Sequence, residues 1–152
     1  MTTSWRIVKA RYAEDAFSGI ASRRRGGRWN PIGIPVVYTS ASASLASLEL
    51  LAHIESDVIN DFVLISCSFH EALVETAEDS RLPENWRTVP PPPELQQIGF
   101  EWYTAQISAV LAVPSALVPI EMNYLLNLDH PDFRSIDISE PRPFKLGFRL
   151  LT

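Results

Sequence analysis

The chain has 152 residues, of which 46% are hydrophobic, 10% aromatic and 20% charged, a composition typical of folded globular proteins rather than disordered ones. Its 13 lysines and arginines are outnumbered by 18 aspartates and glutamates, which gives a net charge of −5. This balance argues against non-specific binding of nucleic acids or of anionic membrane surfaces, because both depend on cationic side chains. From the length we expect one domain, spanning residues 1–152.

Three further features favour a soluble protein in the reducing cytoplasm. Cys67 is the only cysteine, so no internal disulfide can form. The first residues lack the basic-then-apolar pattern of a signal peptide. The longest apolar stretch, residues 107–122, is interrupted by Pro114 and Pro119 and is shorter than the ~20 residues of a membrane-spanning helix.

The first part of the chain predicts a strand, a long loop, a second strand and a helix. Residues 5–9 are apolar and β-branched, which favours a strand, whereas residues 18–33 contain four glycines and predict a loop. Residues 35–40 predict a strand that tolerates a proline at its start. Ser42 is a suitable N-cap for a helix that ends at about Ile54.

The second part predicts a strand, a connector, a helix and further strands. Residues 61–69 are rich in β-formers, residues 90–93 are four prolines that predict a stiff extended connector, and residues 94–106 have helical periodicity. Residues 108–113 and 116–120 predict two short buried strands. A last strand is predicted from alternating apolar residues that face one way, namely Phe144, Leu146, Phe148 and Leu150.

The order of these elements indicates the fold class. Strands flank two predicted helices without the regular alternation of strand and helix that a doubly wound parallel sheet requires. We therefore predict an α+β fold, a single domain with mixed or antiparallel sheets and flanking helices.

Glu49 is a functional candidate on physical grounds. On a helix that starts at Ser42 it shares a face with Leu45 and Leu48, and the helix is apolar almost all round, so we expect it to be largely buried. A carboxylate on such a helix is costly unless it is paired or hydrogen-bonded. Such residues occur at functional sites, although a structural salt bridge to an arginine is the alternative explanation.

Arg28 is a second candidate, because it follows Gly26 and Gly27. Glycines let the backbone approach a ligand closely, and a guanidinium group matches the oxygens of phosphate or carboxylate. The three arginines at 23–25 are more typical of a solvated or partner-facing patch. The sequence lacks the Gly-x-x-x-x-Gly-Lys-Ser/Thr pattern of nucleoside triphosphate sites.

Tyr38 and Ser115 are weaker candidates when taken alone. Tyr38 can either stack on a planar ring or fill the core with its hydroxyl group reaching solvent. Ser115 lies between two apolar segments, where its hydroxyl can point into a cleft, but it lacks the Gly-x-Ser-x-Gly elbow of serine hydrolases. The histidines form no metal-binding pair and Cys67 has no thiol companion, so we predict no metal site.

The order of the motifs is more specific than any one of them. Five blocks follow one another at defined spacings: GRWNP-x-G-x-PVVYTS at 27–40, LA-x-LE at 45–49, VPSA-x-VP at 113–119, E-x-NYLLN at 121–127 and HPDF at 130–133. This series resembles the RES domain family, which is named for an arginine, a glutamate and a serine. Those residues match Arg28, Glu49 and Ser115, and the resemblance extends from about Trp5 to Phe148.

The resemblance implies a function and a partner. Members of the family are bacterial toxins of type II toxin–antitoxin pairs, with an α+β fold similar to that of ADP-ribosyltransferases, and they destroy cellular NAD. Their antitoxin is a helix-turn-helix protein of the Xre type whose C-terminal part blocks the active site. A homodimer and a hetero-oligomer with the antitoxin are both compatible with this expectation. One departure, Leu128 in place of the proline of the family's Asn-Pro-x-His segment, concerns the turn rather than the reaction.

The chemistry of NAD cleavage suits the matched residues. Breaking the nicotinamide–ribose bond passes through an oxocarbenium-like sugar, whose charge Glu49 can stabilise, and Arg28 would hold the pyrophosphate or a ribose oxygen. The leaving group is cationic and departs neutral, so no general acid is needed, and no cofactor is expected because NAD is the substrate. The resemblance implies Arg28, Glu49 and Ser115 as catalytic residues and Arg28, Asn30, Tyr38 and Ser40 as substrate-binding residues.

Two alternatives stay open at the level of sequence. The same site can transfer ADP-ribose to a protein or to phosphate instead of water, because cleft shape and water access choose the acceptor. The other alternative is a non-enzymatic module that senses a nucleotide or docks a partner. The joint presence of Arg28, Tyr38, Glu49 and Ser115 argues against that module.

Overall fold

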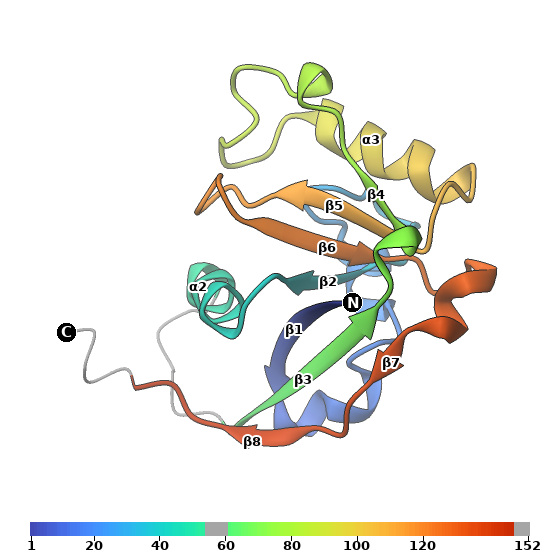
Figure 1. Ribbon diagram of the computed structural model, residues 1–152. Coiled ribbons are helices and arrows are strands. Elements are labelled where there is room, and N and C mark those ends of the chain that lie inside the picture. The colour runs from blue at the N-terminus through green and yellow to red at the C-terminus, as the bar shows by residue number, and fades with distance from the viewer. Residues whose placement is uncertain (54–60, 148–152) are drawn as a thin grey trace.

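The computed structural model describes residues 1–53 and 61–147, which form one mixed sheet surrounded by helices (Figure 1). The strand order is β4-β5-β6-β2-β1-β3-β7, and β8 also pairs with β3. The β4–β5 pair is parallel and the remaining pairs are antiparallel. The strands are β1 Thr2–Lys9, β2 Val37–Ser40, β3 Phe62–Phe69, β4 Val74–Thr76, β5 Val110–Pro114, β6 Met122–Leu126, β7 Asp137–Ile138 and β8 Arg142–Phe144.

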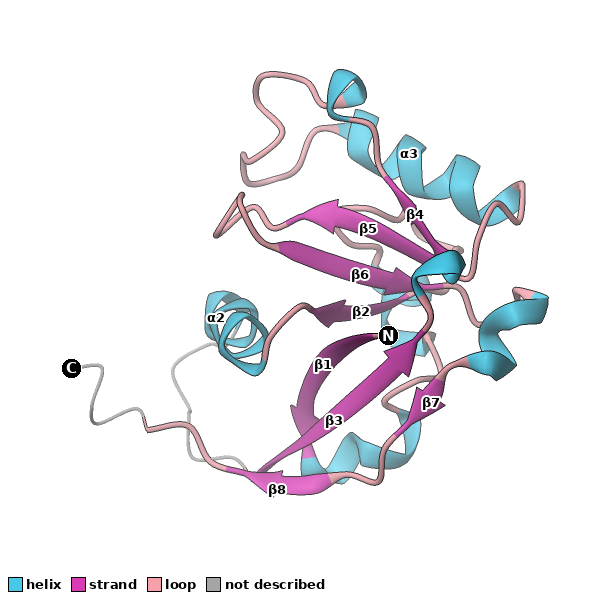
Figure 2. Ribbon diagram, viewed as in Figure 1, coloured by secondary structure: helices cyan, strands magenta, loops and turns pink. Residues whose placement is uncertain are grey.

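Three α-helices occur in the described residues, and all lie around the outside of the sheet (Figure 2). They are α1 Ile20–Arg25, α2 Ala43–His53 and α3 Pro93–Thr104, with short 3₁₀ turns at 10–15, 71–73, 79–81 and 131–135. The predicted α+β class with a mixed sheet is confirmed. None of the helices in the described residues is both long and apolar enough to cross a membrane.

Strands β3 and β5 are mostly apolar and mostly buried, as expected for strands that are covered on both faces. In β3, Leu64 packs in a cluster with Ala46 of α2, whereas the next residue, Ile65, packs with Ala16 on the opposite face. On the other half of the sheet, α3 packs Leu95 and Ile98 into a cluster with β5 and β6.

The sheet is least tightly joined between β1 and β2. A single pair, Trp5 and Ser40, is in register there, whereas β1 pairs with β3 along all eight of its residues. The chain leaves β2 at Ser40 and enters α2 almost at once, so α2 lies beside the place where the two strands separate (Figure 1).

The predicted strands at 5–9, 35–40 and 61–69 correspond to β1, β2 and β3, and the predicted helices correspond to α2 and α3. Ser42 caps α2 as predicted, because its hydroxyl accepts a 3.0 Å hydrogen bond from the amide of Leu45. The predicted end of that helix, Ile54, lies outside the described residues. The strand predicted at 108–113 is present as β5.

The loop predicted at 18–33 is wrong in part, because it contains α1. Gly19 and Gly26 both have a φ of 71° and bracket this short helix at its two ends. Glycine at the ends of so short a helix looks the same in sequence as glycine within a loop. The four-proline connector also ends earlier than predicted, since Pro93 begins α3, where the first amide needs no helical partner.

The strand predicted at 116–120 is wrong. These residues form a turn, because the hydroxyl of Ser115 accepts hydrogen bonds from the amides of Leu117 and Val118, both at 3.1 Å. The strand lies further on, as β6, which we did not predict, and β4 and β7 were also missed. The alternating tail strand is limited to β8, Leu146 is outside it, and Phe148 and Leu150 lie outside the described residues.

Candidate active site

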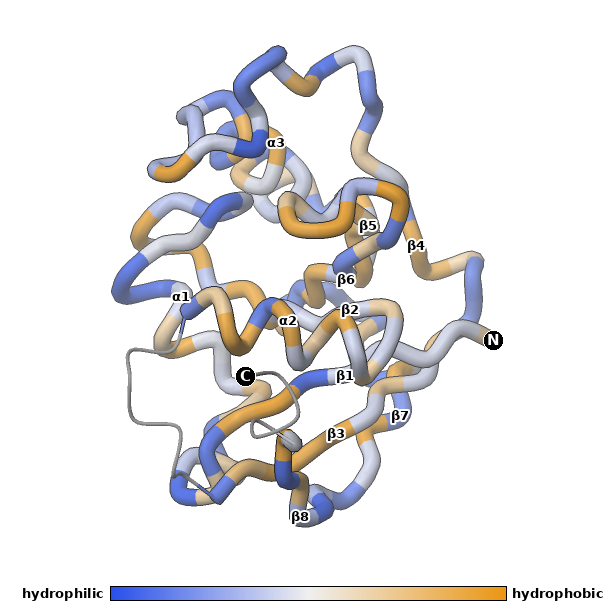
Figure 3. The backbone as a smooth tube through the Cα atoms, turned by 90° about the vertical axis from the view of Figure 1, so that its left-hand side faces the viewer, coloured by the Kyte–Doolittle hydropathy of each residue, from blue (hydrophilic) through white to orange (hydrophobic). Residues whose placement is uncertain are grey.

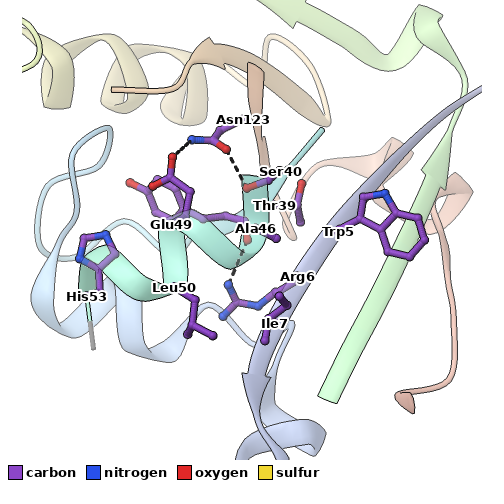
Figure 4. A pocket seen from close by; sticks show the side chains of 11 residues that line it. Trp5, Arg6, Ile7, Thr39, Ser40, Ala46, Glu49, Leu50, His53 and Asn123 are labelled. Atoms are coloured by element: carbon purple, nitrogen blue, oxygen red, sulfur yellow. Dashed lines mark hydrogen bonds between the residues drawn. The ribbon is translucent and has the colours of Figure 1, made fainter. Parts of the chain in front are cut away.

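A pocket of about 170 Å³ opens where β1 and β2 separate (Figure 4). Two strands supply its walls, α2 supplies its third side, and β6 adds one side chain. The lining consists of residues 5–7 of β1, residues 38–40 of β2, Ala46, Glu49, Leu50 and His53 of α2, and Asn123 of β6.

Glu49 is held at the edge of this pocket by two neutral donors. Its Oε1 accepts a 2.9 Å hydrogen bond from the hydroxyl of Ser115 and a 2.8 Å hydrogen bond from Nδ2 of Asn123. Within the described residues, Oε2 has no hydrogen-bond partner. One oxygen of the carboxylate is therefore fixed, and the other is left for a ligand.

The direction of the Ser115 proton follows from the turn. Ser115 is fully buried, and its hydroxyl oxygen already accepts from two backbone amides, which can only donate. The hydroxyl hydrogen therefore points at Glu49. The turn at residues 116–120, which we predicted as a strand, therefore orients the Ser115 hydroxyl as a donor toward the Glu49 carboxylate.

Asn123 is oriented in a similar way by Ser40. The two residues are directly opposite each other in the β2–β6 pair, and the Ser40 hydroxyl donates to Asn123 Oδ1 at 2.8 Å (Figure 4). Because the amide oxygen faces Ser40, the amide nitrogen faces Glu49. A chain of hydrogen bonds therefore runs from Ser40 through Asn123 to the carboxylate.

The helix that carries Glu49 is less buried than we predicted. Leu45 and Ala46 face the core, but 46% of Leu48 is exposed, and Glu49 is half-buried beside the pocket. The salt bridge that offered a structural explanation is also absent from the described residues, where no ion pair includes Glu49. Its partners are a hydroxyl and an amide instead.

Arg28 lies near the carboxylate without being bonded to it. Its Nη1 donates to the carbonyl oxygens of Trp86 at 2.9 Å and Thr88 at 3.0 Å. Burial lowers the pKa of Arg28, and the negative charge of Glu49 opposes that shift. The two predicted catalytic charges are therefore close enough to interact, but Arg28 does not line the pocket, and its guanidinium is anchored to the backbone of Trp86 and Thr88.

Tyr38 has one role in the pocket and another behind it. Its ring lines the pocket, while its hydroxyl donates to Oδ1 of Asn30 and accepts from the amide of Trp29 at 3.1 Å. Burial raises the pKa of Tyr38, so the phenol stays protonated. The expectation that the hydroxyl would reach solvent is therefore wrong, and stacking on a ligand stays a prediction.

Asn30 is fully buried and does not line the pocket. Its Nδ2 donates to the backbone oxygens of Ser22 at 3.0 Å and Ile34 at 2.9 Å, and its Oδ1 is taken by Tyr38. These contacts fix the loop that carries Arg28, residues 26–34, which is called the arginine loop below.

Two glycines let other groups press against the arginine loop. A Cβ atom on Gly27 would lie 2.6 Å from the hydroxyl oxygen of Tyr38, and one on Gly99 of α3 would lie 1.6 Å from the carbonyl oxygen of Trp29. Gln96, one turn before Gly99, donates to the carbonyl of Gly27 at 2.9 Å. Gly27, which we interpreted as room for a ligand, makes room here for Tyr38.

Asn123 and Arg6 line the pocket but were not predicted as site residues. Arg6 donates through Nε to the carbonyl of Ala16 at 2.7 Å and through Nη1 to that of Tyr38 at 3.0 Å (Figure 4). Asn123 lies in the quoted E-x-NYLLN block, where a polar residue beside an apolar run was the available signal. No cluster of metal-ligating side chains occurs in residues 1–53 and 61–147.

Known proteins resemble the chain over most of its length. Residues 3–147 match the model of the RES domain family. A protein named Toxin Res from Photorhabdus laumondii subsp. laumondii is 39% identical over 130 residues, which cover 85% of this chain and 83% of that protein. A Prs ADP-ribosylating toxin from Sphingobium sp. (strain YBL2) is 36% identical, with 99% of this chain and 98% of that protein covered.

A solved structure shares the fold. The toxin–antitoxin complex MbcT–MbcA of M. tuberculosis contains a chain that superimposes with a TM-score of 0.70 at 19% identity, covering 95% of this chain and 84% of that chain. The family match and the relatives agree over nearly the same residues as the motif series. The chain therefore belongs to the RES domain family.

Proposed function

We propose that the protein is a cytoplasmic toxin that hydrolyses NAD to nicotinamide and ADP-ribose. The observation that carries this proposal is the state of Glu49, whose Oε1 is held by Ser115 and Asn123 while Oε2 has no partner within the described residues. A carboxylate fixed in this way beside a small pocket is suited to stabilise developing positive charge on a sugar.

The reaction balances without a further reactant besides water. The bond between ribose C1′ and the nicotinamide nitrogen breaks, and its electron pair neutralises the pyridinium as nicotinamide leaves. Glu49 stabilises the oxocarbenium-like carbon, with Oε2 accepting from a ribose hydroxyl or from the attacking water. The water oxygen bonds to C1′, and its proton is released to solvent.

The other predicted residues surround that centre in two ways. Arg28 has guanidinium donors beyond Nη1 that can take the diphosphate, and the ring of Tyr38 packs on the nicotinamide or its ribose. Asn30 and Ser40 act on the substrate indirectly. Asn30 fixes Tyr38, and Ser40 orients the side-chain amide of Asn123 toward Glu49.

The decisive experiment compares the parent with Glu49→Gln, which keeps the shape of the side chain and removes its charge. We expect NAD loss and nicotinamide release to fall by roughly a thousandfold, in the range of losing a key electrostatic contact in a transition state. Glu75→Gln is the matched control, because Glu75 is exposed on the edge strand β4. A folded Glu49→Gln protein with parental turnover would exclude this proposal.

A second function, transfer of ADP-ribose to a protein, is favoured by one comparison. The Sphingobium relative is named as an ADP-ribosylating toxin and is 36% identical along almost the whole chain. Mass spectrometry of the products, with water alone, with phosphate and with a candidate protein, separates the acceptors. Free ADP-ribose in every reaction supports hydrolysis, whereas a covalent ADP-ribose adduct that replaces it supports transfer.

We also propose an Xre-type helix-turn-helix antitoxin as the partner. The loop between β5 and β6 is largely hydrophobic (Figure 3). In this loop 43% of Leu117 and 93% of Ile120 is exposed. Because Ser115 in the same loop is bonded to Glu49, a protein that covers this loop would also obstruct the pocket. The solved MbcT chain is likewise part of a toxin–antitoxin complex.

A further inference from the structure

A second cleft, of about 390 Å³, is lined by residues of the segment that joins β4 to α3 and by Pro114 and Pro119 at the two ends of the turn after β5. Figure 1 shows the course of these two segments. Its walls combine one large aromatic ring, several prolines and two carboxylates. The side chains that matter below are Trp86, Asp79, Glu84, Pro114 and Pro119. None of them was singled out as part of a site by the sequence.

The second cleft is joined to the Glu49 pocket by two short connections. Pro114, in its wall, directly precedes Ser115, whose hydroxyl is bonded to the carboxylate. Trp86, in the facing wall, has its carbonyl bonded to Nη1 of Arg28. Arg28 lines neither cavity itself, but its guanidinium is bonded to the backbone of Trp86 in the second cleft and interacts electrostatically with Glu49.

A second guanidinium, that of Arg87, is bonded to the loop between β5 and β6. Arg87, next to Trp86 in the chain, donates through Nε to the carbonyl of Ala116 at 2.8 Å, one residue beyond Ser115. Arg28 and Arg87 thus bring two positive charges close to the segment 86–88 and to the loop between β5 and β6. This arrangement suits a diphosphate that passes from one cavity to the other.

The chemistry of the second cleft selects a different group. Its ring and prolines are apolar, while Asp79 and Glu84 can only accept hydrogen bonds when ionised. Neither takes part in an ion pair within the described residues, and the nearby Arg81 is paired with Glu101 at 2.7 Å. A suitable occupant is flat, aromatic and rich in N–H and O–H donors, and it carries no negative charge at that end.

We propose that the second cleft binds the adenosine half of NAD, an inference that rests on the proposed function. The adenine lies against Trp86, its amino group and the ribose hydroxyls donate to Asp79 and Glu84, and the diphosphate crosses Arg28 and Arg87 toward the Glu49 pocket. The two cavities then divide the dinucleotide between them, with the scissile bond beside Glu49.

This assignment has a consequence for specificity. A carboxylate that accepts from a ribose 2′-hydroxyl repels a 2′-phosphate, which is how acidic residues favour NAD over NADP in other dinucleotide sites. We therefore expect the protein to bind a nucleotide with a free 2′-hydroxyl in preference to its 2′-phosphorylated form.

Calorimetric titration with AMP tests the assignment without any need for cleavage. The full chain carrying Glu49→Gln is titrated alone and with Trp86→Ala or Trp86→Phe added, and the fold of each is checked by circular dichroism. We expect Trp86→Ala to weaken AMP binding roughly tenfold or more, the usual effect of losing a stacking ring, and Trp86→Phe to retain most of the affinity. Equal affinity in the Ala variant, or no AMP binding at all, overturns the proposal.

The second arm does not depend on Trp86, which packs partly against the core. The affinities for AMP and for adenosine 2′,5′-bisphosphate are compared in the Glu49→Gln chain and after adding Asp79→Asn with Glu84→Gln, two exposed positions. We expect the preference for AMP to fall several-fold in that variant and to persist in a Glu75→Gln control. An unchanged preference overturns the role of the two carboxylates.

The two hypotheses fail in different ways. AMP binding that depends on Trp86, without NAD cleavage by the parent, would remove the proposed reaction and keep the adenosine cleft. NAD cleavage with AMP binding that ignores Trp86 would keep the reaction and remove the cleft. If Trp86→Ala bound AMP as the parent does but modified a protein acceptor more slowly, the cleft would be assigned to the acceptor instead.

Discussion

Glu49 and Arg28 are held in place by different kinds of hydrogen-bond partner. Glu49 is fixed by side chains, since Ser115 and Asn123 both donate to one of its oxygens. Arg28 is fixed by backbone, since its guanidinium is bonded to the carbonyls of Trp86 and Thr88. The arginine loop is in turn pressed against α3, where a glycine leaves no space for a side chain.

This difference indicates how each part should respond to substitution. The strands behind Glu49 are paired through their backbones, so a polar side chain can be removed there with a small cost in folding and a larger cost in chemistry. The arginine loop depends on close backbone contacts, so an added methyl group there should disturb the fold first. The predictions below test that contrast.

The largest effect on stability is expected from Gly99→Ala. The new Cβ would lie 1.6 Å from the carbonyl oxygen of Trp29, so α3 and the arginine loop must move apart. We expect the free energy of unfolding to fall by about 3 kcal/mol or more and the melting temperature by roughly 10 °C. Thermal denaturation followed by circular dichroism measures both.

Gly33→Ala is the matched control for that substitution. Gly33 has a φ of 98°, but a Cβ there would meet no atom within 4 Å, so only backbone strain of about 1 kcal/mol is expected. Equal destabilisation by the two variants would show that the contact with Trp29 does not limit stability.

Asn123→Ala tests the side-chain half of the contrast. Removing Nδ2 takes one of the two donors from the Glu49 carboxylate, and a hydrogen bond to a charged group contributes about 1.5–3 kcal/mol. We expect kcat for NAD cleavage to fall about 10- to 100-fold, with a smaller change in melting temperature than Gly99→Ala causes. Steady-state kinetics and denaturation of the same preparation decide whether chemistry or folding is affected more.

Much of the site could be predicted from sequence where the signal is local. Glu49 stands out as one acid within an apolar helix, and Arg28 stands out beside its glycines. The capping of α2 by Ser42 and the strands on either side follow from short-range patterns in the same way. These features depend on neighbours within a few residues, which a single sequence shows.

The missed features depend on residues that are distant in sequence. Asn123 gains its role because β6 pairs with β2, which places it opposite Ser40 more than eighty positions earlier. Gly99 looks like an unfavourable residue within a helix until Trp29 is seen against it. The turn after Ser115 was interpreted as a strand because its residues are mostly apolar. The sequence does not show that the Ser115 hydroxyl accepts from two backbone amides and so forms a turn.

Tyr38→Phe tests both the pocket and the arginine loop, because the ring lines the pocket and the hydroxyl anchors the loop. Losing the hydroxyl leaves Oδ1 of Asn30 and the amide of Trp29 without that partner, at a cost of about 1–2 kcal/mol in unfolding free energy. We expect the KM for NAD to rise more than kcat falls, because the ring remains and the loop loosens. A normal KM with a large loss of kcat would place the hydroxyl at the reacting atoms instead.

The same residue gives a prediction for pH. Burial raises the pKa of Tyr38 above its ordinary value of 10.0, so the folded protein keeps the proton to a higher pH than the unfolded chain does. The contribution of Tyr38 to stability is therefore complete below about pH 10 and declines as the pH rises toward the folded-state pKa. The melting temperatures of the parent and of Tyr38→Phe should differ by a constant amount from pH 8 to about pH 10 and converge above pH 10, and a difference that stays constant up to pH 11 would contradict this linkage.

Ser40→Ala is expected to have the smallest effect, because Ser40 reaches Glu49 only through Asn123. Without the serine hydroxyl, the amide of Asn123 loses the bond that sets its orientation but keeps its donor to the carboxylate. We expect kcat to fall only a few-fold, for a neutral hydrogen bond of about 1 kcal/mol. In the Asn123→Ala background the substitution should change kcat no further, because the two residues act in series. Additive losses in that double-mutant cycle would mean that Ser40 contacts the substrate directly, as a substrate-binding residue would.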